Sequence, residues 1–170
     1  YQSWLYLPDT LCCWRQHETA HRYFCEGIMK KLPGSSGCYV CGRENPVSLK
    51  LEFYARAEGE VISEFELPEQ YAGYPGMIHG GNIVAILDET AGRALTTDDP
   101  NRFMVTNELK VKYLHPVPTN TKLTVVGKKV KQRGRIGVAH SEILDASGQA
   151  LAVCDAFFVD VTEDLTAGMD

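Results

Sequence analysis

The sequence lacks several features that assign a chain to common classes of protein. It has no basic excess: 17 Lys and Arg against 22 Asp and Glu give a formal net charge of −5, which argues against a general nucleic-acid binder. No apolar run approaches the length of a membrane span, and the longest near the glycine-rich segment is 83–87. Residues 1–30 contain no continuous apolar segment of the kind found in signal peptides. We therefore expect a cytoplasmic protein that binds neither nucleic acid nor membrane.

Cysteine is too scarce and too unevenly spaced to form a disulfide scaffold in a chain of 170 residues. We expect the thiols to be reduced. Internal repeats and low-complexity tracts are also absent, whereas 44% of the residues are apolar, enough for one domain with a substantial core. The six cysteines are Cys12, Cys13, Cys25, Cys38, Cys41 and Cys154.

Residues 1–28 differ in composition from the rest, since they hold both tryptophans and three of the six cysteines. Asp9 and Thr10 are suitable N-caps for a helix that runs to about Lys31. Our hypothesis is that Met29 is a natural start, so that the residues before it are an upstream leader or an accessory helix. The mass of the natively expressed protein would decide between them.

The apolar pattern from about residue 48 onward predicts an α+β domain, which we assign to residues 36–165 after an N-terminal extension of residues 1–35. Short segments in which apolar and polar residues alternate predict strands with one buried face. A 3.6-residue period between the second and third of these segments predicts one long helix. An antiparallel sheet of about six strands would wrap around this helix. The expected strands are 49–53, 60–67, 108–113, 121–132, 135–144 and 149–161, and the expected helix is 80–97.

The most informative segment, 76–88, is a glycine-rich turn carrying His79 that runs directly into the predicted helix. Gly80 and Gly81 leave bare backbone N–H groups at the positive end of that helix, where a developing oxyanion would be stabilised. Asp88 lies within the apolar stripe of the helix, and a desolvated carboxylate there is costly unless it is used or satisfied. Such donors and a buried carboxylate are the components of acyl-transfer chemistry. The stripe consists of Val84, Leu87, Ala91 and Leu95.

The segment His79-Gly80-Gly81, with Asp88 nine positions after the histidine, resembles the signature of hot-dog-fold acyl-CoA thioesterases of the phenylacetate-pathway (PaaI-like) type, in the 4-hydroxybenzoyl-CoA thioesterase superfamily. Segments 38–46 and 106–117 are similar to that family as well. The resemblance implies a hot-dog fold assembled as a homodimer or homotetramer. It also implies hydrolysis of an acyl-CoA thioester to free acid and coenzyme A. Coenzyme A is then part of the substrate, and neither a cofactor nor a metal is expected.

The resemblance assigns a role to four residues. Asp88 is the catalytic carboxylate, either attacking the thioester carbonyl or activating water. The Gly80 N–H polarises the carbonyl, while His79 shapes the turn and lines the site. Thr106 falls where some members have a hydroxyl that orients the hydrolytic water. Because the family's pocket lies between subunits, Asp88 and Thr106 are expected to face Gly80 of a partner chain.

Five of the 17 basic residues fall within positions 128–135, around a glycine that predicts a hairpin turn. An acidic protein that binds the polyanionic nucleotide of coenzyme A needs a local positive patch. A solvated hairpin tip is the alternative interpretation. The residues that we expect to bind the substrate or its coenzyme A part are Gly81, Asn82, Lys131, Arg133, Gly134 and Arg135.

The sequence departs from the family pattern at Gly73, six residues before the histidine, where related enzymes often carry Asn or Gln. The second donor to the thioester carbonyl therefore stays open, with Tyr74 and Gln70 as the available substitutes. The motif also leaves open the acyl group, and it leaves acyl-carrier protein as an alternative carrier to coenzyme A.

Glu89 is the obvious rival to Asp88. It lies about 100° further round the helix and is spaced with Arg93 for an exposed ion pair. We favour Asp88 because the motif spacing and the apolar stripe agree on it. A buried carboxylate satisfied by backbone donors is the structural alternative for Asp88.

Two patterns suggest zinc. The segment 17–21 matches the protease motif His-Glu-x-x-His, but nothing nearby supplies a third ligand or a cleft, so we interpret it as coincidence. Cys38 and Cys41 have the spacing of a zinc knuckle, and His17 or His21 would complete four ligands. No second pair of ligands follows at the usual distance, and the resemblance accounts for the two cysteines as a compact turn. We therefore expect no metal.

Two other functions are compatible with the same fold, because a fold does not fix a function. One is a non-catalytic acyl-CoA-binding hot-dog protein, and the other is a hydratase or dehydratase. Asp88 after the His-Gly-Gly segment favours hydrolysis over both.

Overall fold

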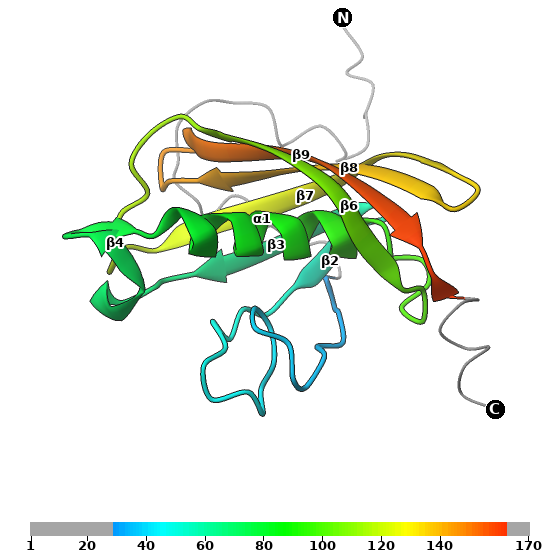
Figure 1. Cartoon of the computed structure of the whole chain (residues 1–170), viewed down its shortest axis with the longest axis horizontal. Helices are drawn as coiled ribbons and strands as arrows, with labels where there is room; N and C mark the ends of the chain where they lie inside the picture. The colour runs from blue at the N-terminus through cyan, green and yellow to red at the C-terminus, as the bar shows by residue number, and fades with distance from the viewer. Residues whose placement is uncertain (1–28, 163–170) are drawn as a thin grey trace, which may run out of the picture.

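The structure, a computed structural model, describes residues 29–162, in which a curved antiparallel sheet wraps around one helix (Figure 1). The strand order β1-β2-β3-β7-β8-β9-β6 places β6 at one edge of the sheet. The sheet consists of β1 (Lys30–Lys31), β2 (Tyr54–Ala57), β3 (Glu60–Phe65), β6 (Met104–Tyr113), β7 (Leu123–Arg133), β8 (Ile136–Leu144) and β9 (Ala150–Asp160), and the helix is α1 (Gly80–Ala94). A 3-10 turn, η2 (Glu69–Tyr71), and a two-stranded sheet, β4 (Ala72–Tyr74) with β5 (Met77–Ile78), lead into α1.

The prediction of about six antiparallel strands around one long helix is confirmed, with the two-residue β1 as an additional strand. The turns predicted at Gly134 and at 145–148 are also present, and Gly134 and Gly148 both adopt a positive φ, which glycine permits without strain. None of the helices in the described part of the chain has the length and apolar content to cross a membrane.

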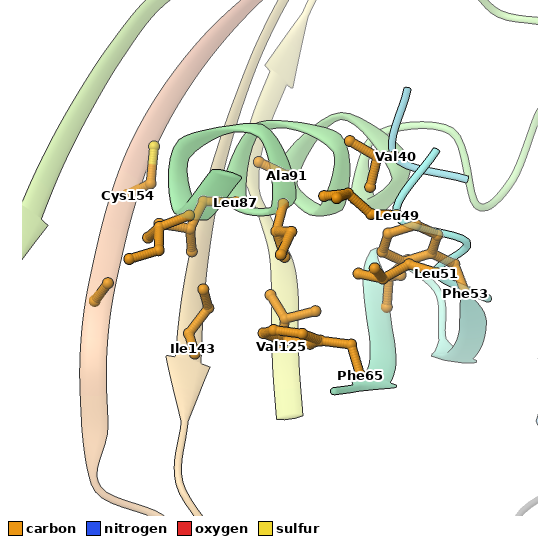
Figure 2. Close-up of a cluster of buried hydrophobic side chains, with 14 of the residues drawn as sticks. Val40, Leu49, Leu51, Phe53, Phe65, Leu87, Ala91, Val125, Ile143 and Cys154 are labelled. Carbon is orange, nitrogen blue, oxygen red and sulfur yellow. The ribbon is translucent and has the colours of Figure 1, made fainter. Parts of the chain in front are cut away.

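The buried face of α1 packs against the concave face of the sheet (Figure 2). Leu87 and Ala91 on the helix meet Val125 and Ile143 on the central strands. At Gly127 the sheet approaches so closely that a Cβ would lie 2.6 Å from the Thr90 carbonyl oxygen. The helix is therefore fixed against β7 by contact with the backbone itself. The buried helix residues are Ile83, Ile86, Leu87, Thr90, Ala91 and Ala94.

The strand predicted at 49–53 is wrong, although its alternation of buried and exposed side chains is correct. Lys50 has a φ of 62°, which turns the backbone out of an extended strand. The segment pairs instead with the preceding loop, where the Leu49 N–H donates to the Tyr39 carbonyl at 2.8 Å. Pairing with the sheet begins only at β2, so these residues form a lining beside α1 rather than a strand.

The helix predicted to end near Lys31 is wrong at that end, because Lys30–Lys31 pairs with β2 as strand β1. Leu32, which follows β1, is buried in the core. The sheet and core thus already include residues that the sequence assigned to the extension 1–35. The remaining predictions for residues 1–28, among them the His-Glu-x-x-His pattern, lie outside the described residues.

Candidate active site

Asp88 and Thr106 come together between α1 and the edge strand β6. The Thr106 hydroxyl donates a hydrogen bond to the Asp88 carboxylate, with 2.8 Å between the oxygens. The pairing of β6 with β9 is irregular between Thr106 and Glu108, as in a β-bulge. A bulge changes which side chains face the core, and here it lets Thr106 and Leu109 both point toward the helix side. The structure therefore unites two of the predicted catalytic residues.

The surroundings of Asp88 favour its use as a base. Burial raises the pKa of this carboxyl above its ordinary value, the Thr106 hydrogen bond lowers it in part, and the charge of Glu89 adds to the rise. A carboxylate that is harder to ionise holds a proton more tightly, and it accepts one from water more readily. The structure thus places the carboxylate that the sequence favoured in an environment suited to proton transfer.

The Asp88 carboxylate opens into a pocket of about 610 Å³ between the C-terminal half of α1, β6 and the loop after the helix. Asp88, Thr106 and Gly92 line this pocket, and so do the apolar side chains of Phe103 and Phe158. Polar side chains, among them Glu89, Arg93 and Arg102, also line this pocket. A concave site that combines apolar surface with polar groups suits a small molecule.

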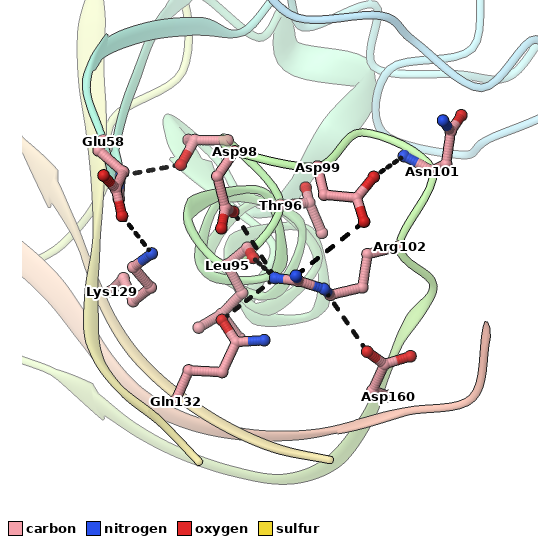
Figure 3. A network of polar contacts seen from close by, with 12 residues as sticks. Glu58, Leu95, Thr96, Asp98, Asp99, Asn101, Arg102, Lys129, Gln132 and Asp160 are labelled. Carbon is pink, nitrogen blue, oxygen red and sulfur yellow. Dashed lines mark hydrogen bonds and ion pairs between the residues drawn. The ribbon is translucent and has the colours of Figure 1, made fainter. Parts of the chain in front are cut away.

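Arg102 holds the loop that walls this pocket (Figure 3). Its guanidinium contacts the Asp98, Asp99 and Asp160 carboxylates at 3.6, 4.0 and 3.5 Å. It also donates to the Gln132 side-chain oxygen at 3.3 Å, which connects the loop to the tip of the β7–β8 hairpin. One side chain thus fixes the pocket wall to both β7 and β9.

A second set of predicted residues lies at the N-terminus of α1. The His79 side chain caps the helix, since its Nδ1 accepts from the Gly81 N–H at 3.0 Å. The His79 carbonyl accepts from the Asn82 and Ile83 N–H groups. Of the N–H groups in the first turn of the helix, only that of Gly80 has no acceptor within residues 29–162. The structure therefore singles out Gly80 as the helix-end donor that is available to a ligand.

The Gly80 donor faces a separate pocket of about 680 Å³, lined also by His79, Tyr74 and Tyr113. The Tyr113 hydroxyl donates to the Gly80 carbonyl at 3.2 Å. Tyr113 was not among the predicted site residues, although it lies on the apolar side of an alternating strand. A side chain at Gly73 would be crowded, because a Cβ there would lie 3.1 Å from the His79 ring.

The two sets of residues are not brought together within one chain. Gly80 and Asp88 are separated by eight residues of one helix, which amounts to about 12 Å. They share the same half-buried flank of α1, which runs along β6 with Gly80 beside Tyr113 and Asp88 beside Thr106. Each chain therefore presents a carboxylate half-site and a donor half-site on one face.

The predicted substrate-binding residues are in different situations. Both ends of the Asn82 amide are engaged within the chain: its oxygen accepts from the Tyr39 hydroxyl at 2.7 Å, and its nitrogen donates to the Tyr71 carbonyl at 3.1 Å. Like the Gly81 N–H, it therefore organises the start of the helix. Lys131 and Arg133 are exposed at the hairpin tip and make no ion pair within the described residues.

The other basic side chains of the hairpin have partners. Lys128 pairs with Glu60 at 3.2 Å and Lys129 with Glu58 at 3.1 Å. Arg135 donates from Nε to the Asp160 carbonyl at 2.8 Å. Lys131 and Arg133 are thus the basic side chains of this hairpin that have no carboxylate partner among the described residues.

Glu89 forms the predicted ion pair with Arg93, at 2.8 Å between Oε1 and Nε, but the pair is not exposed. The Arg93 and Glu89 side chains are only 13% and 24% accessible. Loop residues 33–41 cover them, and the Glu89 oxygens contact the Cys38 and Cys41 thiols. The sequence could not reveal this cover, since it depends on how a distant loop folds back on the helix.

Known proteins that this chain resembles include thioesterases and a protein named as an esterase. Residues 75–152 match the sequence model of the Thioesterase superfamily. The acyl-coenzyme A thioesterase THEM4 of Rattus norvegicus is 31% identical over 141 residues, which cover 78% of this chain and 58% of that protein. A protein of Saccharolobus solfataricus named as an esterase is 30% identical over 92 residues, covering 54% of this chain and 65% of its own length.

The solved structure of RHA08564, a thioesterase superfamily protein, superimposes with a TM-score of 0.66 at 27% identity, covering 73% of this chain and 60% of that one. The chain spans less than two thirds of the length of the curated relatives described above. The residues matched by the family model include the helix with the His79–Asp88 segment and the strands β6, β7 and β8. The chain therefore has the hot-dog fold, and its residues 75–152 are similar to the Thioesterase superfamily.

Proposed function

We propose that the protein hydrolyses acyl-CoA thioesters in a site shared by two copies of the chain, as a homodimer or a dimer of dimers. The observation that carries this proposal is the separation of the carboxylate and the Gly80 donor along one helix flank. Two such flanks packed antiparallel about a twofold axis bring Gly80 of one chain to Asp88 of the other. Two complete sites then form from two incomplete ones.

The edge strand β6 supports such an assembly. It is ten residues long and pairs on one side with β9, so its other side offers unpaired backbone groups. Apolar side chains on and beside it are exposed, including Val105 at 52% and Tyr113 at 55%. Pairing with a second β6 would cover both the backbone groups and these side chains.

The chemistry follows from the two half-sites. The Gly80 N–H hydrogen-bonds the thioester oxygen, and this bond strengthens as negative charge develops there. In one route Asp88 takes a proton from a water held by Thr106 while that water attacks the carbonyl carbon; the carbon–sulfur bond breaks to give the free acid, and the proton passes to the coenzyme A thiolate. In the other route Asp88 attacks the carbonyl carbon, the carbon–sulfur bond breaks to form an anhydride, and water hydrolyses the anhydride to the free acid while the leaving thiolate takes a proton. The coenzyme A named for the rat relative supports this choice of substrate.

Thiol release from a panel of acyl-CoAs, and from the same acyl groups on acyl-carrier protein, tests the proposal directly. We expect turnover with at least one acyl-CoA. Tight binding of acyl-CoA without any thiol release would instead make the protein a non-catalytic acyl-CoA-binding domain.

Replacing Thr106 by Val should shift the pH profile of kcat/KM, so that the rise in kcat/KM on the acidic side, the acidic limb, occurs at higher pH. The Thr106 hydrogen bond lowers the pKa of Asp88, so its loss raises that pKa further and delays ionisation of the base. Thr106→Ser retains the hydroxyl and serves as the control, for which we expect a limb near that of the wild type. A limb that stays in place, or moves to lower pH, in Thr106→Val would contradict a carboxylate acting in its ionised form.

Neutralising Lys131 and Arg133 with Gln should raise KM for acyl-CoA roughly tenfold at low salt, and less at high salt, because salt screens attraction to phosphate. The matched control is the Lys128→Gln, Lys129→Gln pair, since those side chains already have carboxylate partners. An acyl thioester without the nucleotide should be unaffected. Equal losses for both substrates would show that the hairpin acts through structure alone.

A further inference from the structure

Three side chains that commonly bind metals converge beside the carboxylate pocket. The Cys38 Sγ lies 3.6 Å from Glu89 Oε2, and the Cys41 Sγ lies 3.4 Å from Glu89 Oε1. The ligand atoms of all three residues lie within 4.8 Å of one another. We propose that Cys38, Cys41 and Glu89 bind one Zn²⁺ ion that attaches the 33–48 loop to helix α1.

The distances agree with the geometry of zinc. With Zn–S of about 2.3 Å and Zn–O of about 2.0 Å at tetrahedral angles, a sulfur and an oxygen ligand lie about 3.5 Å apart. The observed distances are close to that value, although they run to different oxygens, 3.4 Å from Cys41 Sγ to Glu89 Oε1 and 3.6 Å from Cys38 Sγ to Glu89 Oε2. Binding through a single Glu89 oxygen therefore requires the carboxylate to turn. The two sulfurs lie within 4.8 Å of each other, against about 3.8 Å for two sulfur ligands at tetrahedral angles. Three protein ligands leave a fourth position for water.

The backbone around the cysteines is folded as a tight turn that presents both sulfurs to one side. The Gly42 N–H donates to the Cys38 carbonyl at 2.9 Å, and a Cβ at Gly42 would lie 2.4 Å from that same oxygen. Only glycine fits this position. The Val40 N–H points at the Cys38 sulfur at 3.3 Å, and a backbone donor to sulfur stabilises a thiolate. The turn is thus built for sulfur ligands rather than for two isolated thiols.

Arg93 provides the second layer of such a site. Its Nε donates to Glu89 Oε1 at 2.8 Å and its Nη2 to the Cys41 sulfur at 3.0 Å. The guanidinium is held in place by the Pro33 carbonyl at 2.8 Å and by the Phe53 ring, whose centroid is 4.7 Å away. Hydrogen bonds of this kind orient the ligands of a metal and tune their basicity.

The formal charges balance in both states. Without metal, the Arg93 cation and the Glu89 anion cancel, and the two thiols are neutral. When Zn²⁺ enters, two thiol protons leave, and the cation, two thiolates, one carboxylate and one guanidinium again sum to zero. The half-buried site thus gains the ion without being left with an uncompensated charge, which is the costly case for buried groups. Helix α1 and the 33–48 loop can therefore bind the ion without a change in the net charge of the site.

The test begins with the full chain, purified under reducing conditions and without added metal chelators. Mass spectrometry of the metal content should find one zinc per chain, and X-ray absorption should count two sulfur ligands. After removal of zinc, Co²⁺ should give the sulfur-to-metal absorption and the intense visible bands of a tetrahedral thiolate site. These measurements need no substitution, so they hold even if a variant fails to fold.

Substitutions of the three proposed ligands test which side chains bind the metal. Cys38→Ser and Cys41→Ser should each abolish the Co²⁺ thiolate absorption of the wild type or halve its intensity, and Glu89→Gln should weaken Zn²⁺ binding at least tenfold. Cys154→Ser, a buried cysteine on β9, and the joint replacement of Cys12, Cys13 and Cys25 by Ser should leave binding unchanged. Reduced protein without zinc affinity, a Cys38–Cys41 disulfide in place of metal, or full binding by both Cys38→Ser and Cys41→Ser would overturn the proposal.

Discussion

Replacing Asp88 by Asn is expected to lower thioester turnover by a factor of about 10² or more while the fold persists. Asn keeps the size of the side chain and can still accept the Thr106 hydrogen bond, but it has no charge with which to attack or to accept a proton. Because burial raises the pKa of Asp88, the loss of its charge also removes an unfavourable desolvation, so Asp88→Asn should unfold no more easily than the wild type. Thiol release and thermal unfolding, measured on the same preparation, separate the two effects.

Asp155→Asn is the matched control for Asp88→Asn. Asp155 is exposed on β9 and pairs with His140 at 2.8 Å, away from either half-site, so we expect turnover close to that of the wild type. Glu89→Gln should lose less turnover than Asp88→Asn. Near-normal hydrolysis by Asp88→Asn, or a larger loss in Glu89→Gln, would reverse the assignment of the base.

Replacing Gly80 by Pro is expected to lower turnover by a factor of about 10² to 10³, because it removes one hydrogen-bond donor to the thioester oxygen. Proline is well tolerated at the first position of a helix, and the extended backbone of His79, at φ −59° and ψ 136°, suits a residue that precedes proline. Gly80→Ala is the control, since it adds the same Cβ 3.2 Å from the Tyr113 hydroxyl but keeps the N–H. Equal losses in the two variants would point to crowding at Tyr113 rather than to the donor.

Mixing the inactive Asp88→Asn and Gly80→Pro proteins tests whether the site is shared. Random exchange makes half of the dimers mixed, and each mixed dimer holds one intact site of two, so about a quarter of the wild-type activity should return. A site contained in one chain would regain none. Full activity of a monomer at micromolar concentration would likewise exclude the shared site.

Local patterns in the sequence predicted where the candidate site residues lie. The structure places His79 and Gly80 at the start of α1 and Asp88 further along it, as predicted, because a helix end and its stripe are local features that a few residues define. Strand alternation placed β3 and β6 to β9 for the same reason. The segment 49–53 was wrongly predicted as a strand, because alternation of buried and exposed residues does not show which segment pairs with it. The pattern also gives no sign of the positive φ of Lys50.

Sequence patterns could not predict that the 33–41 loop covers Glu89. Glu89 and Arg93 have helical spacing, which predicts their ion pair, but spacing alone does not tell which flank a loop from 48 residues upstream will cover. The same holds for Tyr113 and Gly80, which meet only because β6 returns along the helix. Contacts between distant segments depend on the tertiary fold, and so both the thiol cluster and the donor pocket needed the structure.

The irregular pairing of β6 between Thr106 and Glu108 has a consequence for how two chains align. Two evenly pleated strands can slide past each other in steps of two residues, about 7 Å, and keep the same side chains inward. A slide of that size would carry Gly80 of one chain out of reach of Asp88 of the other. A bulge at the third to fifth residues of β6 breaks the even pleat, so neighbouring alignments lose hydrogen bonds. In the proposed dimer, the same bulge that aims Thr106 at Asp88 can thus favour a single alignment of the two chains.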